Sequence, residues 1–191
     1  MRDLAILTFL TLDGVMQSPG SPEEDPSGGF ERGGWAQNCW DEVMEQVMGE
    51  AMAEPYDLLL GRKTYEGFAA YFCGGGNDPV ALKLNQAKKY VATSTLTNLD
   101  WKNSVAISGD IVAEVSRLKA QEGPLLQVHG SWQLIQTLLD HGLVDEFRLW
   151  TFPIVVGPGK RLFGEGTLST DLTLIKTDTC PSGATMSIYR R

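Results

Sequence analysis

The sequence predicts an α/β fold with three layers and a mixed, mostly parallel central sheet. Short apolar runs alternate along the chain with segments of helical periodicity, an order that is typical of parallel strands joined by helices. The last two extended segments flank the turn tetrapeptide CPSG and predict an antiparallel hairpin at the C-terminus. The 191 residues contain no internal repeat and no linker, so we expect residues 1–191 to form one domain.

The chain opens with a predicted strand and a long loop. Leu4–Leu12 is an apolar run interrupted by threonines, and it lacks the small-residue cleavage site of a signal peptide, so it predicts a buried first strand. The segment from Asp13 to Gly34 is rich in Gly, Pro, Ser and Glu. Loops of this length are uncommon in compact domains, so its middle part is either a functional lid or a disordered insertion.

A helix is expected next, over Ala36–Ala53, and Pro55 ends it. Its apolar residues recur at intervals of three and four, which is the spacing of a helix face packed on a core. These residues are Trp40, Val43, Met44, Val47, Met48, Ala51 and Met52. We interpret them as core residues rather than as a cofactor-binding stripe.

The rest of the chain continues the alternation of strands and helices. Tyr56–Leu60 is too apolar for an edge strand and predicts a central strand covered on both faces. The glycines of the predicted loop Cys73–Pro79 lack the spacing of a phosphate-binding fingerprint. Pro153 lies within the predicted strand Phe147–Val156 and indicates an edge position or a bulge. The other expected strands are Tyr90–Ser94, Val105–Ser108, Leu125–His129, Leu172–Thr177 and Ala184–Tyr189. The other expected helices are Thr64–Phe72, Pro79–Lys88, Ile111–Ala120 and Trp132–Leu139.

Composition argues against several kinds of partner. The 24 acidic residues outnumber the 16 basic residues and give a net charge of −8, which argues against binding to nucleic acid. No apolar run is long enough to cross a membrane, so we expect no membrane partner. The odd set of Cys39, Cys73 and Cys180, with only two histidines, predicts neither a disulfide framework nor a metal site. We therefore expect a reducing, cytoplasmic location.

The first indication of function is the junction LLLGRKT, where a buried strand passes into a helix. Gly61 lets a ligand approach the backbone, while Arg62, Lys63 and the hydroxyl of Thr64 add charge and hydrogen-bonding groups to the positive end of the helix dipole. Anions bind readily at such helix starts. In open α/β sheets, ligands bind at the carboxyl ends of the strands, where this junction falls.

The same pattern recurs at LLQVHGSW, which places Gly130, Ser131 and Trp132 at a second turn from strand to helix. The strand that ends in YVATS places Ser94 at a third strand end. Each feature alone has a structural alternative, because surface charges and helix caps use the same residue types. Their combination favours a site for a phosphate-bearing ligand.

Several motifs carry a resemblance to a known family. In chain order they are TLDG at 11–14, LLLGRKTYE at 58–66, KKYVATSTL at 88–96, HGSWQLIQTLLDHGLVDEFRL at 129–149, PIVVGPGKRLF at 153–163 and CPSGATMSIYR at 180–190. The chain resembles the dihydrofolate-reductase-like superfamily, in the bacterial branch related to the C-terminal reductase domain of riboflavin biosynthesis (the RibD C-terminal branch). The motifs span nearly the whole chain in the family's order. The resemblance implies a three-layer dihydrofolate-reductase-like fold and a homodimer.

The resemblance also implies NADPH as the cofactor, bound across the carboxyl edge of the sheet. The family's phosphate-binding turn is matched by Gly61, Arg62, Lys63 and Thr64. Positions around the adenosine 2′-phosphate are matched by Arg62 and Ser94. The turn that holds the pyrophosphate and the nicotinamide side is matched by Gly130, Ser131 and Trp132. The family often has a small residue where Trp132 stands.

On the substrate side, Asp13 ends the first strand beside the long loop. The resemblance favours a catalytic position for Asp13, where it would orient the substrate or a proton-donating water; the alternative is a structural Asp-Gly turn. Glu45 falls near the acidic residue with which dihydrofolate reductases bind the pteridine, but the folate-type Trp-x-x-Pro context is absent. A solvated acidic helix face is the preferred interpretation of Glu45.

We therefore expect an NADPH-dependent reductase that transfers a hydride to a small heterocyclic substrate, either pteridine-like or pyrimidine-like. In this respect the chain is similar to the 5-amino-6-(5-phosphoribosylamino)uracil reductase domain. One alternative is a dihydrofolate reductase. Another is a catalytically inactive nucleotide-binding stress protein, which the bulky Trp132 and the lack of an obvious proton donor favour.

Overall fold

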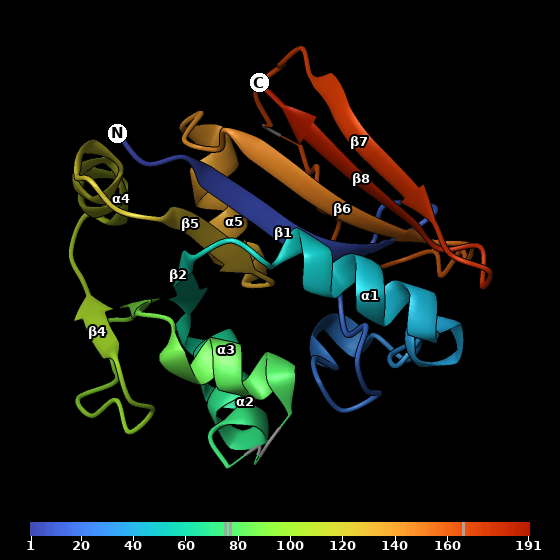
Figure 1. Ribbon diagram of the computed structural model, residues 1–191, viewed down its shortest axis with the longest axis horizontal. Helices are drawn as coiled ribbons and strands as arrows, with labels where there is room; N and C mark the ends of the chain where they lie inside the picture. Colours follow the sequence, from blue (N-terminus) through green and yellow to red (C-terminus); the bar gives the residue numbers. More distant parts are fainter. Residues whose placement is uncertain (75, 77, 166) are drawn as a thin grey trace.

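The computed structural model describes residues 1–74, 76, 78–165 and 167–191, and its centre is an eight-stranded sheet (Figure 1). The strand order is β4-β3-β2-β5-β1-β6-β8-β7. The strands are β1 (Leu4–Thr11), β2 (Tyr56–Gly61), β3 (Lys89–Ala92), β4 (Ser104–Ile107), β5 (Leu125–His129), β6 (Glu146–Phe152), β7 (Thr173–Thr179) and β8 (Thr185–Arg190). The helices are α1 (Glu42–Ala51), α2 (Arg62–Phe72), α3 (Pro79–Gln86), α4 (Ile111–Ala120) and α5 (Trp132–Asp140), with short 3-10 turns η1 (Ser27–Gly29) and η2 (Gln37–Cys39).

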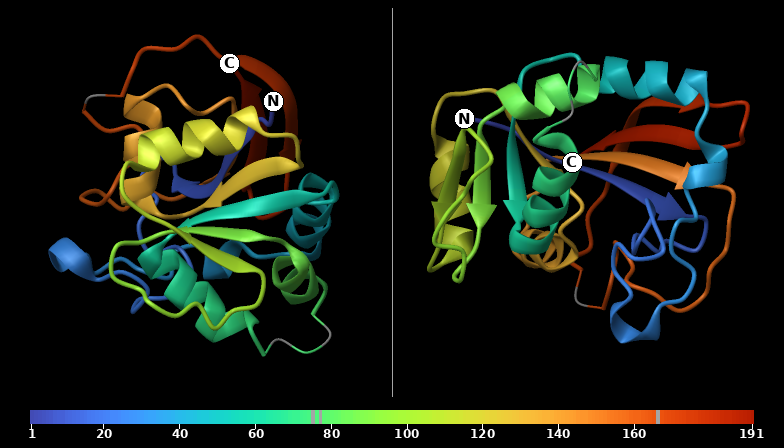
Figure 2. Two further views of the ribbon diagram at one scale, coloured as in Figure 1. Left: turned by 90° about the vertical axis from the view of Figure 1, so that its left-hand side faces the viewer. Right: turned by 90° about the horizontal axis from the view of Figure 1, so that it is seen from below.

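The sheet is mixed. Every pairing among β1 to β6 is parallel, whereas β8 pairs antiparallel with both β6 and β7. One apolar core packs α1, α2 and α3 on one face of the sheet, and a second packs α4 and α5 on the other. The left panel of Figure 2 shows α4 and α5 on one side of the strands and α2 and α3 on the opposite side. The predicted three-layer α/β fold with a C-terminal hairpin is confirmed.

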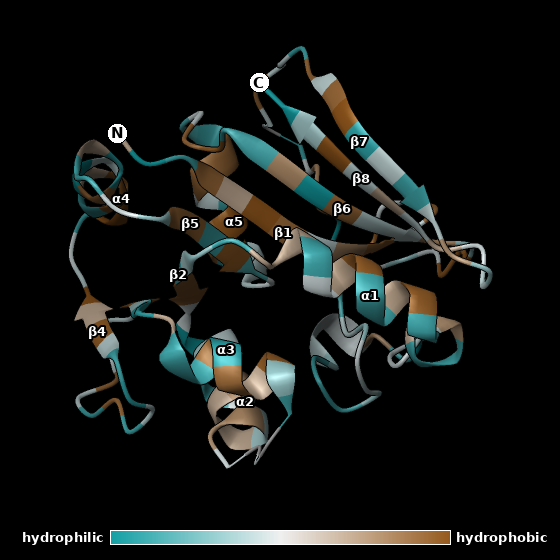
Figure 3. Ribbon diagram, in the orientation of Figure 1, coloured by the Kyte–Doolittle hydropathy of each residue, from teal (hydrophilic) through white to brown (hydrophobic). Residues whose placement is uncertain are grey.

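The strand β2 lies between β3 and β5 and is buried from both sides. Leu58 and Leu60 face the core beneath α1, α2 and α3, and Leu59 faces the core beneath α4 and α5. All three side chains are fully buried. Figure 3 shows the same apolar character along much of β1 and β2. The central position predicted from three consecutive leucines is therefore confirmed.

The predicted helix Ala36–Ala53 is too long at its N-terminal end. The chain forms the 3-10 turn η2, becomes extended at Trp40 and Asp41, and starts α1 only at Glu42. The cause is Asp41, whose carboxylate accepts a hydrogen bond from the N–H of Met44 and caps the helix. As a result, Trp40 and Val43 are 44% and 39% exposed, and the prediction that they belong to the core is wrong.

Two predicted strand ends also differ from the structure. The strand β6 stops at Phe152, and it lies between β1 and β8, so the prediction of an edge strand or a bulge at Pro153 is wrong. Pro153 follows the strand, where its missing N–H costs no ladder hydrogen bond. Ser94 lies beyond the end of β3 in an exposed turn. The predicted loop Cys73–Pro79 includes residues 75 and 77, which lie outside the described residues.

The sheet has a step at its carboxyl edge. Parallel pairing of β1 with β5 ends at Leu7 and His129, whereas pairing of β1 with β6 continues to Thr11 and Phe152. Residues 8–11 of β1 therefore extend past the end of β5 and have a partner strand on one side only. At this step, the carboxyl end of β1 lies beside the carboxyl ends of β5 and β2.

The described residues contain neither a candidate membrane span nor a candidate metal cluster. None of the helices there is long and apolar enough to cross a membrane. Within the same residues, no group of three or more His, Cys, Asp or Glu side chains is placed to hold a metal ion.

Candidate cofactor and substrate site

Two helices begin side by side at the carboxyl edge of the sheet. The strands β2 and β5 are parallel neighbours, with Leu59 opposite Val128; β2 passes directly into α2, and β5 reaches α5 through Gly130 and Ser131. The N–H of Gly61, before α2, donates to Oγ of Ser131, before α5, at 2.8 Å. The helix α2 packs on one face of the sheet and α5 on the other, so the connections that leave β2 and β5 turn to opposite faces. Ligands of open α/β sheets bind at such a switch point.

These two helix starts differ from the other three. The helices α1, α3 and α4 each follow an aspartate, namely Asp41, Asp78 and Asp110, whose carboxylate accepts a hydrogen bond from the first helical turn. The helices α2 and α5 follow Gly61 and Ser131, and neither residue caps its helix through a side chain. The first-turn N–H groups of α2 and α5 are therefore open to an external anion.

The backbone at this place is tightly folded. Gly130 and Ser131 both have positive φ angles, of 53° and 66°. A left-handed conformation is uncommon for a residue with a side chain, and such strain collects at functional sites. A Cβ atom on Gly61 would lie 3.3 Å from Cβ of Ser131, and one on Gly130 would lie 3.6 Å from the side chain of Thr64. Glycines at these positions let the two helix starts approach each other.

The predicted phosphate-binding cations lie at the same edge but on its outer side. Arg62 and Lys63 occupy the first turn of α2 and are exposed, and Arg62 forms an exposed ion pair with Glu66 at 3.3 Å. Gly61 is opposite Ala92 in the pairing of β2 with β3, which brings Ser94 to the neighbouring strand end. The site residues predicted on β2, β3 and β5 therefore share one edge of the sheet, although no direct contact joins Arg62 to Ser94.

Trp132 is the first residue of α5, and its indole lies against the segment that follows β6. Its Nε1 donates to the carbonyl of Arg161 at 2.9 Å, and Nζ of Lys160 lies 5.7 Å from its ring centroid. A cavity of about 620 Å³ is bordered by this indole, by residues 27–32 and by residues 158–161. The bulky side chain thus forms a wall beside the turn at Gly130 and Ser131.

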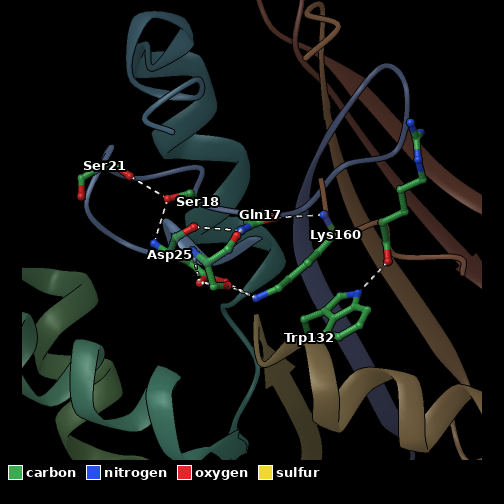
Figure 4. A network of polar contacts seen from close by, with 8 residues as sticks. Gln17, Ser18, Ser21, Asp25, Trp132 and Lys160 are labelled. Carbon is green, nitrogen blue, oxygen red and sulfur yellow. Dashed lines mark hydrogen bonds and ion pairs between the residues drawn. The ribbon is translucent and has the colours of Figure 1, made fainter. Parts of the chain in front are cut away.

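The long loop is fastened by a polar network (Figure 4). The side-chain amide of Gln17 donates to the carbonyls of Asp25 and Ser27, and its oxygen accepts from the N–H of Lys160. Oγ of Ser18 accepts from the N–H of Asp25, and Nζ of Lys160 lies 2.5 Å from the Asp25 carboxylate. Gln17 and Ser18 are buried. These contacts argue against a disordered insertion, and the role of the loop as a lid stays a prediction.

Asp13 connects the end of β1 to the segment after β6. Its carboxylate accepts from Oγ1 of Thr11 at 2.6 Å and from the N–H groups of Gly157 and Val156 at 2.9 and 3.3 Å. The Thr11 hydrogen bond is the largest cause that lowers the pKa of Asp13, and the two backbone donors act in the same direction. The structure thus places Asp13 at the step of the sheet as an ionised carboxylate with its acceptor sites largely engaged.

The step also exposes backbone groups of β1. The N–H of Leu126 in β5 donates to the carbonyl of Asp3, and the N–H of Asp145 near β6 donates to the carbonyl of Leu4. Odd-numbered residues of β1 therefore direct their peptide groups toward β5, and even-numbered ones toward β6. Phe9 lies beyond the last pairing with β5, so its N–H and C=O face the step.

Sequence reasoning missed a buried polar chain beneath this edge. Arg148 on β6 forms a 2.6 Å ion pair with Glu146 and donates to Oε1 of Gln127 on β5 at 3.2 Å. Nε2 of Gln127 lies 2.6 Å from Nε2 of His129. Burial, followed by the charge of Arg148, lowers the pKa of His129 to about 4. The available signal was the polar residues at alternate positions of two otherwise apolar strands, in LLQVH and EFRLW.

Within the part of the chain that the structure describes, the acidic residue Glu45 on α1 is linked to the step only through Trp40, whose ring lies 6.1 Å from that of Phe9. Glu45 is exposed and accepts a hydrogen bond from Nε1 of Trp40 at 3.1 Å. This geometry agrees with the interpretation of Glu45 as part of a solvated acidic face.

Comparison with known proteins identifies the family. The family model of the RibD C-terminal domain matches residues 3–186. The chain belongs to the RibD C-terminal domain family. The RibD C-terminal branch predicted from the motifs is therefore confirmed.

Two relatives from Bacillus subtilis strain 168 are named as uncharacterized proteins. YyaP is 34% identical over 154 residues, which cover 77% of this chain and 81% of that protein. YwjB is 28% identical over 117 residues, which cover 61% of this chain and 63% of that protein. The names of these two relatives indicate no activity.

Two solved structures share the fold. A Shewanella sp. PV-4 protein assigned by its name to riboflavin biosynthesis has a TM-score of 0.66 and 21% identity, covering 100% of this chain and 99% of that one. Dihydrofolate reductase from Enterococcus faecalis, in complex with NADP(H) and RAB-propyl, has a TM-score of 0.58 and 14% identity, covering 99% and 96%. The fold of this RibD C-terminal domain is thus dihydrofolate-reductase-like.

We predict that His129 makes stability depend on pH. The ordinary pKa of histidine is 6.5 and that of folded His129 is about 4, so the unfolded chain binds the extra proton between these values. The free energy of unfolding should fall by roughly 3 kcal/mol as the pH drops from 6.5 to 4. Denaturant titrations at several pH values measure it. The variant His129→Gln should lose this pH dependence, whereas His141→Gln, at an exposed histidine, should keep it. If the free energy of unfolding changes equally with pH in the wild type and both variants, the prediction is wrong.

We predict that Asp25→Ala loosens the long loop, because it removes the partner of Lys160 and an acceptor for Ser27. Limited proteolysis should cleave residues 18–34 about 3–10 times faster, as expected for losing roughly 1 kcal/mol from local opening. The matched control is Glu23→Ala, at an exposed acidic residue of the same loop. If Asp25→Ala and the wild type are cleaved equally fast, the ion pair does not hold the loop.

Proposed function

We propose that this protein is an NADPH-dependent reductase that transfers a hydride to a small heterocyclic substrate. The observation that carries the proposal is the pair of uncapped helix starts at adjacent strand ends, joined by Gly61 and Ser131. Open amides from two helices suit the two linked phosphates of a dinucleotide better than a single phosphate. Membership of the RibD C-terminal domain family supports a reductase-type enzyme.

The residues at the edge fit the parts of this cofactor. The first-turn amides of α2 and the turn at Gly130 and Ser131 would hold the pyrophosphate. Arg62, with Ser94 at the neighbouring strand end, would hold the 2′-phosphate through charge-assisted hydrogen bonds. The N–H of Phe9 and its C=O, which accepts only a long 3.4 Å hydrogen bond from Oγ1 of Thr8, would offer one donor and one acceptor to the carboxamide of the nicotinamide. When bound, the reduced nicotinamide supplies the hydride.

The protein's own residues would orient the reactants and exclude water. The indole of Trp132 and the loop fastened by Lys160 border the region beside the helix starts. Asp13, whose pKa is lowered, would act as an ionised carboxylate that orients the substrate or a water. It would not itself donate the proton near neutral pH.

A second candidate function is nucleotide binding without turnover. The observation that favours it is the engaged state of Asp13, which leaves the step without an evident acid. Absorbance of NADPH can be followed with dihydrofolate, pterins and 5-aminouracil derivatives. Oxidation with one of these compounds supports the reductase, and tight NADPH binding with no oxidation by any of them supports the alternative.

We further propose that residues 1–191 act as one domain in a cytoplasmic homodimer. The exposed Leu174 and Ile175 on the edge strand β7 support a contact between subunits. Analytical ultracentrifugation tests this proposal, and a monomer at all protein concentrations would contradict it.

We predict that Arg62→Ala lowers the affinity for NADPH and leaves the affinity for NADH nearly unchanged. Loss of a charged contact to the 2′-phosphate should weaken NADPH binding about 10–100-fold, equivalent to roughly 1.5–3 kcal/mol, and leave NADH binding nearly unchanged. Quenching of tryptophan fluorescence measures both affinities. Arg117→Ala removes a similarly exposed, ion-paired arginine on α4 and serves as the control. A wild-type protein that binds NADPH and NADH equally would contradict the assignment of the 2′-phosphate.

We predict a different result for Ser131→Asp. A carboxylate there would face the open amides of α2 and α5 and repel an incoming pyrophosphate, which both cofactors share. The affinities for NADPH and NADH should fall together, by about 100-fold or more. Circular dichroism and thermal unfolding check that the variant remains folded. A folded variant with unchanged affinity would show that the pyrophosphate does not bind between the two helices.

A further inference from the structure

His129 is the last residue of β5, directly before the turn at Gly130 and Ser131. Its side chain lies on the face covered by α1 and α2, where it packs edge-on against Phe68 at 6.0 Å between ring centroids. His129 keeps 8% of its surface exposed, whereas Gln127, two residues earlier on the same face, keeps none. On β5 the histidine is thus the more accessible of the two polar residues, and it lies at the edge where the substrate would meet the cofactor.

The polar chain fixes which nitrogen of His129 carries the proton. Arg148 has no acceptor and donates to Oε1 of Gln127, which turns Nε2 of that amide toward the imidazole. An amide nitrogen donates hydrogen bonds only, so Nε2 of His129 must be the acceptor. The proton of the neutral ring then sits on Nδ1, for which no partner occurs among the described residues. Glu146 in turn holds Arg148 at 2.6 Å.

A second polar group nearby also lacks a partner. The ring of Tyr56 lies 6.3 Å from that of His129, and its hydroxyl is fully buried without a hydrogen bond in the described part of the chain. Tyr56 as a whole is only 5% exposed. Buried donors are rarely left unsatisfied, so the buried Tyr56 hydroxyl, together with the unpaired Nδ1 of the slightly exposed His129, indicates that a ligand or water completes the hydrogen bonding there.

We propose that His129 is a specificity-determining residue that donates a hydrogen bond from Nδ1–H to the substrate. The inference rests on the proposed reductase function and narrows its substrate class. The substrate is a neutral heterocycle that presents a hydrogen-bond acceptor, either a carbonyl oxygen or an unprotonated ring nitrogen, toward β5. Aromatic neighbours such as Phe68 supply a matching apolar surface for such a ring.

The polar contacts of His129 exclude a role as a charged proton donor. Arg148 acts through Gln127 and opposes a positive charge on the imidazole, and Tyr56 and Phe68 add no negative charge. His129 therefore stays neutral at physiological pH and orients the substrate as a donor, as a neutral histidine can at an enzyme site. Proton delivery to the reduced product falls to another group, such as a water near Asp13.

The first test reads the tautomer directly. His129 and His141 are the only histidines, so a protein labelled with 15N-histidine gives two ring systems in long-range 1H–15N spectra. His129 should appear as the neutral Nδ1–H form from neutral pH down to about pH 5. The exposed His141 is the internal reference. Gln127→Leu should release the preference for Nδ1–H. An Nε2–H tautomer or an imidazolium at neutral pH in the wild-type protein overturns the proposal.

The second test uses a matched pair of ligands. Pterin carries a 4-oxo acceptor, and 2,4-diaminopteridine carries an amino group in its place. In the NADPH-loaded protein, pterin should shift the His129 Nδ1–H resonance and bind about tenfold or more tightly than the diamino compound. Binding of neither compound at millimolar concentration, or equal binding without a shift at His129, overturns the substrate class.

Two substitutions separate hydrogen bonding from packing. His129→Asn places an amide N–H near the position of Nδ1, and His129→Phe keeps a ring without a donor. Pterin affinity should be largely retained in the first and fall about tenfold or more in the second. NADPH affinity, measured separately by tryptophan fluorescence, reports on the cofactor proposal alone. Loss of NADPH binding with intact pterin binding would refute the cofactor and leave the role of His129 standing.

Discussion

The hydrogen bond from the N–H of Gly61 to Oγ of Ser131 is the contact on which the candidate site depends. It joins the ends of β2 and β5, which are followed by α2 on one face of the sheet and α5 on the other. Neither helix can then be capped by its own preceding residue, because one is glycine and the hydroxyl of the other is already engaged. The open amides at this edge follow from the topology as much as from the residue types.

The unequal strand lengths supply the second half of the site. Had β5 continued alongside β1, the peptide groups of Phe9 would be used in the ladder. Instead β5 turns away at Gly130, where a positive φ angle ends the extended conformation. The same turn therefore frees backbone groups on β1 and positions the start of α5. Asp13 and the segment after β6 hold the projecting end of β1 in place.

The sequence was sufficient to predict the fold, and the site that it predicts falls at strand ends that the structure brings to one edge of the sheet. Three consecutive leucines identified the central strand, and two glycine-bearing junctions identified the helix starts. It was insufficient where a local side-chain contact competes with periodicity, as when Asp41 stops a helix that the apolar spacing would extend to Ala36. The chain from Arg148 through Gln127 to His129 could not be predicted, because it depends on the register between strands far apart in sequence. For Asp13, the residue was predictable but its engaged hydrogen bonds were not.

The uncapped helix starts also set the range over which an anion would be attracted. The molecule carries a net charge of −8, so its overall field repels an anionic ligand at a distance. Attraction to open amides acts only close by, within about one Debye length, roughly 8 Å at physiological ionic strength. An anionic ligand would therefore reach this edge by random encounter and then be held by short-range contacts with the amides. Added salt would speed the encounter, because it screens the repulsion between the ligand and the net negative charge of the protein.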